Sequence, residues 1–197
     1  MTGKKTIKYN LIEAAGKELF WKHGIARVNV DEICSAAGVS RMTFYKYFRN
    51  KTHLALVVLQ TYYDDSIKRY SSIMSSEREF PDKVRELILL KIEGVHDFSK
   101  EFLNDILKDE GSELSAWYHK IYTDTIDLVI RDLGTAQKKG EIRKDLKLEF
   151  IMYIFDKTFE MARDQALLSH YNSVQEIVLE IVNFYFYGIM PHKNKVR

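Results

Sequence analysis

Hydrophobic residues recur at helical spacing near the start of the chain. Leu11, Ala15 and Leu19 fall on one face of a helix. The hydroxyl of Thr6 precedes this pattern as a candidate N-cap, and Gly24 follows it as a candidate C-cap. The pattern therefore predicts a first helix between these two residues.

Two shorter helices are expected next. Asn29 is a strong N-cap, and Glu32 completes a capping box, so a second helix should begin there and stop at Gly38. Ser40 is the next N-cap, and it introduces a third helix over residues 41–48.

The rest of the chain continues the helical pattern in longer segments. Pro81 suits the first turn of a helix, and the next break is expected near Gly111. The other helices are expected over about 52–73, 113–139, 148–169 and 174–190. We therefore expect an all-α fold, with a three-helix domain over residues 1–51 and a helical bundle over residues 52–197.

Composition supports a helical chain with a real core. Hydrophobic residues make up 46% of the sequence, and the 2 prolines and 9 glycines are few breakers for 197 residues. The single cysteine, Cys34, excludes an internal disulfide. The polar start resembles no signal peptide, and the longest mostly apolar run, 181–190, is too short to span a bilayer. We expect a cytoplasmic protein with no membrane contact.

Charge is unevenly distributed. Residues 1–51 hold ten Lys and Arg but four Asp and Glu, a net charge of +6, whereas the remaining residues carry −4. A basic N-terminal domain on a mildly acidic body favours a polyanion as its partner, although a solvated run of charge is the alternative.

The second and third helices have the geometry of a helix-turn-helix. Gly38 allows the tight turn between them, and the third helix is expected to enter the major groove. Its outward residues can meet bases or phosphates: Arg41, Met42, Thr43, Tyr45 and Lys46. Phe44 and Phe48 are expected in the core. Lys51 begins the next helix, where backbone N–H groups also favour a phosphate.

This segment resembles the tetracycline-repressor (TetR) family. The matching stretches are residues 11–15 (LIEAA), 36–40 (AAGVS) and 43–48 (TFYKYF), followed by Lys51. Three positions depart from the family pattern: Asn29 replaces a usual Thr, Cys34 replaces a usual Ala, and Met42 stands where a small residue is common.

The resemblance implies a bacterial DNA-binding transcriptional regulator. It implies a homodimer that binds a palindromic operator and, as a repressor, releases it when a small-molecule effector occupies a C-terminal pocket. The implied DNA-contacting residues are Ser40, Arg41, Met42, Thr43, Tyr45, Lys46, Tyr47 and Lys51. Apolar stripes on the last two helices are expected to form the dimer interface.

The effector pocket is harder to place. Aromatic residues at helical spacing are more often core than ligand cage, so the resemblance alone supplies the expectation of a pocket. The candidates for its lining are Phe98, Phe102, Trp117, Tyr118, Tyr122, Tyr153, Phe155 and Phe159.

Other functions find less support in the sequence. The six histidines lack metal-ligand spacing, so no metal and no cofactor are expected. Glu93, Asp97 and Glu101 share a helical face, which is more typical of a solvated stripe than of acid–base catalysis. An enzyme on a helical scaffold is therefore disfavoured. The remaining alternative is a helix-turn-helix protein that is controlled by a protein partner or has no effector.

Overall fold

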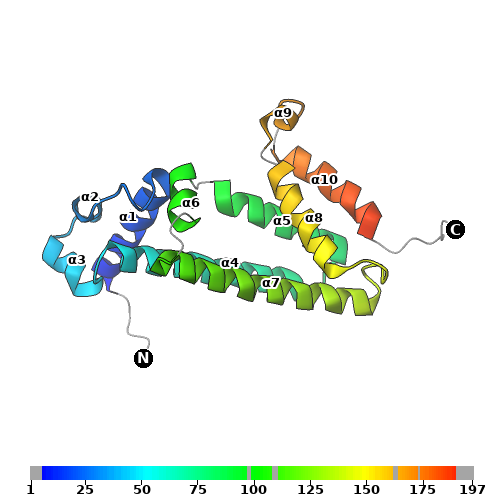
Figure 1. Cartoon of the computed structure of the whole chain (residues 1–197), viewed down its shortest axis with the longest axis horizontal. Coiled ribbons are helices and arrows are strands. Elements are labelled where there is room, and N and C mark those ends of the chain that lie inside the picture. The colour runs from blue at the N-terminus through cyan, green and yellow to red at the C-terminus, as the bar shows by residue number, and fades with distance from the viewer. Residues whose placement is uncertain (1–5, 97–98, 108–110, 162–163, 173, 190–197) are drawn as a thin grey trace. The chain divides into compact units, whose positions relative to one another are not determined.

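The computed structural model describes residues 6–96, 99–107, 111–161, 164–172 and 174–189 (Figure 1). Every regular element in these ranges is a helix, which confirms the all-α prediction. The helices are α1 (Ile7–His23), α2 (Val30–Ala37), α3 (Arg41–Tyr47), α4 (Lys51–Met74), α5 (Phe80–His96), α6 (Lys100–Leu107), α7 (Glu113–Lys139), α8 (Leu148–Met161), α9 (Gln165–Leu168) and α10 (Val174–Ile189). None of them is both long and apolar enough to cross a membrane.

The chain divides into two compact units. Unit 1 comprises Met1–Ile67 and Asp97–Tyr122, and unit 2 comprises Lys68–His96 and Thr123–Arg197. The boundary expected at residue 51 lies inside unit 1, because the start of α4 and all of α6 belong to it. The division at residue 51 remains a prediction about where the DNA-binding function resides.

The first two helices of unit 1 begin and end as the sequence predicts. The Thr6 hydroxyl accepts a hydrogen bond from the Tyr9 N–H, and Gly24 ends α1 with a φ of 82°. The Asn29 side chain accepts from the Glu32 N–H at 3.0 Å, and the Glu32 carboxylate accepts from the Asn29 N–H at 2.9 Å. The predicted capping box is therefore confirmed.

The turn into α3 needs glycine, because Gly38 has a φ of 64°. Ser40 caps α3 as predicted, but the helix ends at Tyr47, one residue earlier than expected. Phe48 leaves the helix with an extended backbone while its side chain stays in the core. The Asn50 side chain then accepts from the His53 N–H at 2.7 Å and caps α4.

The core of unit 1 forms around aromatic side chains. Phe20, Phe44, Phe48 and Leu54 are fully buried, so α1, α3 and α4 share one apolar cluster. Phe102 of α6 is fully buried in the same cluster. A segment far beyond the helix-turn-helix in sequence thus completes its core, and Figure 1 shows α6 lying beside α1.

Two segments that were expected to be continuous helices are divided. The Ser99 hydroxyl accepts from the Phe102 N–H at 3.1 Å and so caps a separate helix, α6, within the segment expected to run on to Gly111. The Asp164 carboxylate accepts from the N–H groups of Ala166 and Leu167, and this cap starts α9 within the predicted helix 148–169. Local side-chain caps explain both differences.

Unit 2 is built on α5, which packs against both α8 and α10 (Figure 1). Its buried core takes Val84 and Ile88 from α5, Ile151 from α8, and Ile177 and Ile181 from α10.

A polar contact also joins α4 to α7 within unit 2. The Tyr70 hydroxyl donates to the Asp132 carboxylate at 2.9 Å, and burial, together with this bond, raises the pKa of Tyr70. The tyrosine therefore stays a neutral donor at physiological pH.

Candidate nucleic-acid interface

The candidate interface is the outer face of α3, a helix of seven residues. Its inner face is fixed by Phe44, which is fully buried, and by Phe48 directly after the helix. The ring centroids of these two phenylalanines lie 5.7 Å apart. Because the inner face is anchored, the side chains of Arg41, Met42, Tyr45 and Lys46 are held on the outside of unit 1.

Five of the eight predicted DNA-contacting residues are exposed. Met42 is 84% exposed, the highest value among the large apolar residues whose side chains the structure describes, and Tyr45 is 55% exposed. The other three are Ser40, Arg41 and Lys46. The exposed methionine side chain is therefore accessible to a partner.

Arg41 is paired with Asp31 of α2. The guanidinium Nε and Nη2 atoms each donate to one carboxylate oxygen, while both side chains remain more than half exposed. The pair holds the guanidinium plane in one orientation and leaves Nη1 free of this carboxylate. The role of Asp31 could not be predicted from the sequence, because its pairing with Arg41 depends on how α2 crosses α3 and has no helical spacing.

Three predicted contact residues, Thr43, Tyr47 and Lys51, are only half exposed because they also have structural roles. The Ser40 hydroxyl accepts from the Thr43 N–H at 3.2 Å and lies 3.1 Å from the Thr43 hydroxyl. The Tyr47 hydroxyl accepts from the Thr6 hydroxyl at 2.9 Å. The third is Lys51, whose ammonium donates to the carbonyls of Ala26 at 2.9 Å and Val28 at 2.6 Å.

The eight aromatic candidates for an effector pocket do not share one environment. Phe102 lies in the core of unit 1, and Trp117 and Tyr118 pack against that core. Tyr122 is 49% and Tyr153 is 58% exposed. Phe98 lies outside the described residues, as do the side chains of two further candidates, Phe155 and Phe159.

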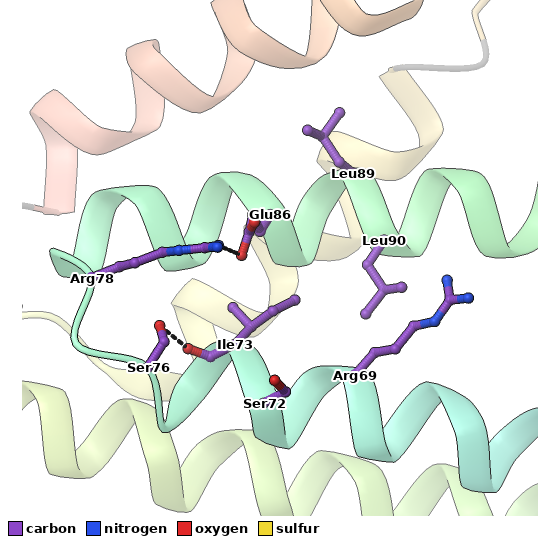
Figure 2. Close-up of a pocket in the computed structure, with 8 residues that line it drawn as sticks. All are labelled: Arg69, Ser72, Ile73, Ser76, Arg78, Glu86, Leu89 and Leu90. Atoms are coloured by element: carbon purple, nitrogen blue, oxygen red, sulfur yellow. Dashed lines mark hydrogen bonds and ion pairs between the residues drawn. The ribbon is translucent and has the colours of Figure 1, made fainter.

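A pocket of about 450 Å³ does occur in unit 2, between the end of α4 and the start of α5 (Figure 2). Its polar lining includes Arg69, Arg78 and Glu86, and the last two form an ion pair. The other lining residues are Ser72, Ile73, Ser76, Leu89 and Leu90. None of the eight aromatic candidates is among these residues.

This pocket could not be predicted from the sequence, because it depends on how α5 folds back beside α4. The signal in the sequence was a pair of arginines, Arg69 before the polar break between the two helices and Arg78 within it. That signal alone did not distinguish a site from a solvated surface.

Other candidate chemistry has no support among the described residues. No group of three His, Cys, Asp or Glu side chains there could hold a metal ion. Cys34 is buried, and its burial, reinforced by Asp31, raises the pKa of its thiol. A raised pKa disfavours the reactive thiolate.

Comparison with known proteins agrees with the helix-turn-helix and the all-α fold. Residues 12–58 match the family model described as bacterial regulatory proteins, tetR family. The chain is 25% identical over 187 residues to the HTH-type transcriptional regulator YdgC of Bacillus subtilis, covering 95% of this chain and 94% of that protein.

Solved structures share the fold over most of the chain. The fatty acid degradation regulator FadR of Bacillus halodurans superposes with a TM-score of 0.74 at 20% identity, covering 94% of this chain and 98% of that one. FadR of Bacillus subtilis, solved with stearoyl-CoA, gives a TM-score of 0.71 at 19% identity, covering 92% and 99%.

The helix-turn-helix and its exposed α3 face thus define a DNA-binding transcriptional regulator. Its DNA-binding segment matches the TetR family, and the chain is similar to a transcriptional regulator over most of its length.

Proposed function

We propose that this regulator acts in the cytoplasm as a homodimeric repressor that binds an inverted-repeat operator and releases it when an effector binds in unit 2. The observation that carries the DNA-binding part is the division of α3 into two faces. Phe44 is fully buried on one face, whereas Arg41, Met42 and Lys46 are exposed on the other. A buried anchor beneath exposed cations is what a recognition helix requires.

The exposed side chains have distinct roles in this proposal. Arg41 reaches a base edge with the Nη1 donors that Asp31 leaves available, and Met42 meets a thymine methyl group. Lys46 and Tyr45 contact phosphates, which position the helix without reading sequence. Ser40, Thr43 and Tyr47 add hydroxyl contacts at the edge of the interface.

The dimer interface in this proposal is formed by α8 and α10. Phe150, Tyr153 and Met161 are exposed on α8 at spacings that place them on one helical face. Phe184 of α10 is 75% exposed. Large apolar side chains gathered in this way are typical of surfaces that are covered by a partner. A second copy of the chain related by a two-fold axis would bury both stripes.

The pocket between α4 and α5 is the proposed effector site. Its volume of about 450 Å³ lies within the range of small-molecule sites, about 300–1,000 Å³. Glu86 already pairs with Arg78, so Arg69 is the guanidinium that an incoming anion would meet. Ile73, Leu89 and Leu90 supply apolar lining. We therefore propose an effector with an anionic group and an apolar chain, a chemistry shared by the stearoyl-CoA found with FadR of Bacillus subtilis.

Arg41 and Lys46 should affect DNA binding differently. With a duplex from the promoter next to the chain's own gene, Arg41→Ala should weaken binding by about 1–3 kcal/mol but leave random duplex nearly unaffected. Lys46→Ala should weaken both duplexes and reduce the slope of log K against log salt by about 0.9. Fluorescence anisotropy measures both effects, with Lys144→Ala in unit 2 as the control. Equal losses of affinity on both duplexes for Arg41→Ala would show that Arg41 contacts a phosphate and not a base.

The assembly is tested by placing a charge in the apolar stripe. Phe184→Arg should shift the chain from dimer to monomer at micromolar concentration, because a buried unpaired charge opposes association. The control Ile7→Arg changes a residue that is 80% exposed in unit 1 and should leave the dimer intact. Sedimentation velocity distinguishes the two species, and a wild-type monomer would contradict the proposed interface.

The effector site is tested with dodecanoate and with dodecanol, which has the same chain length but no charge. At a hundred times its Kd, dodecanoate should stabilise the protein by about 2.7 kcal/mol. Arg69→Ala should weaken dodecanoate binding about tenfold, the loss of about 1.4 kcal/mol expected for a charged hydrogen bond, whereas Arg85→Ala outside the lining should not.

Dodecanoate should also lower operator affinity tenfold to a hundredfold, a coupling of about 1.4–2.7 kcal/mol, and DNA should weaken dodecanoate binding by the same factor. Calorimetric titration with and without DNA measures this coupling. Equal affinities in the two titrations would favour control by a protein partner.

A further inference from the structure

The backbone turn between α1 and α2, residues 24–28, is held by two charged side chains from distant parts of unit 1. The Asp105 carboxylate of α6 accepts a hydrogen bond from the Ala26 N–H at 2.8 Å. The Lys51 ammonium of α4 donates to the Ala26 carbonyl at 2.9 Å and to the Val28 carbonyl at 2.6 Å. Both backbone polar groups of Ala26 are therefore bonded to side chains of opposite charge.

Close packing holds α6 against this turn. A Cβ added at Gly24 would lie 2.7 Å from the Asp105 carboxylate and 3.0 Å from the Glu101 Cβ. The Ser99 N–H donates to the Trp21 carbonyl at 2.9 Å, and the ring centroids of Phe102 and Trp21 lie 4.6 Å apart. Hence α6 contacts the end of α1 through backbone, ring and carboxylate together.

Lys51 is placed to support the turn and not to reach outward. Two of its three N–H donors are used by the turn carbonyls. Burial lowers the pKa of Lys51, while the nearby carboxylates of Asp105 and Glu32 raise it. Lys46, by contrast, is an exposed cation on the outer face of α3.

The position of this turn determines where α2 begins, because Asn29, the N-cap of α2, follows it directly. In turn, α2 contacts both α1 and α3. With only eight and seven residues, α2 and α3 take their direction from such contacts and not from their own stability.

We propose that Lys51 and Asp105 are positioning residues for operator binding, which hold the α1–α2 turn and thereby the orientation of α3. Lys51 supports DNA affinity through this turn and not by neutralising a phosphate. Asp105, which lies far outside the helix-turn-helix sequence, is part of the DNA-binding machinery. The proposal rests on the DNA-binding function and extends it to α6.

The test compares salt dependence in the full-length chain, with the duplex from the promoter next to its own gene. Lys51→Met keeps the aliphatic stem, and Asp105→Ala removes the acceptor. Each should lower affinity at least fivefold while the slope of log K against log salt stays at the wild-type value. Lys46→Ala, the phosphate-contact control, should reduce that slope by about 0.9. Asn104→Ala, an exposed position on α6, should leave affinity and slope unchanged.

The two sites should also be coupled. The double variant should lose no more affinity than the weaker-binding single variant, because both changes release the same turn. Asp105→Asn retains the side-chain shape and one acceptor oxygen, so this variant should fold and show a smaller loss of DNA affinity. It provides the test even if a melting experiment shows that Asp105→Ala is unfolded.

Three results would overturn the proposal: a reduced slope for Lys51→Met, unchanged affinity for the folded Asp105 variants, or additive losses in the double variant. Failure of the wild-type chain to bind the duplex would instead count against the proposed operator function.

Discussion

The proposed DNA-binding surface depends on the burial of Phe44 and Phe48, because a helix of seven residues is too short to form or hold its direction alone. Full burial of each phenylalanine contributes about 1.5–3 kcal/mol. That contribution comes from neighbours on other helices, including Phe20 of α1 and Leu54 of α4. The positions of the outer side chains of α3 therefore depend on the packing of the core beneath them. This core extends to Phe102 of α6.

The N-terminal helices could be predicted from the sequence because their signals are local. The Asn29–Glu32 capping box, the left-handed Gly38 and the Ser40 cap each act within a few residues, and each is present in the structure. The buried positions of Phe44 and Phe48 follow from the same short-range pattern. For this part of the chain, local chemistry and tertiary packing favour the same structure.

Features that depend on distant contacts could not be predicted in this way. Asp31 and Arg41 are brought together by the crossing of two helices, and Asp105 reaches Ala26 across 79 positions of sequence. The caps at Ser99 and Asp164 interrupt segments whose hydrophobic spacing continues, so the periodicity alone overestimated two helices. The aromatic residues chosen as pocket lining are instead divided between a buried core and exposed surface where the structure describes them, because helical spacing does not distinguish a core from a cavity.

In the proposed regulator, a two-fold pair of α3 helices reads a specific DNA sequence. The most direct measurement is selection of binding sites by the purified chain from a library of random duplexes, followed by sequencing. We expect enrichment of an inverted repeat whose half-site centres lie one or more helical turns apart, a turn being about 34 Å. Enrichment of a single asymmetric site, or no enrichment at all, would contradict it.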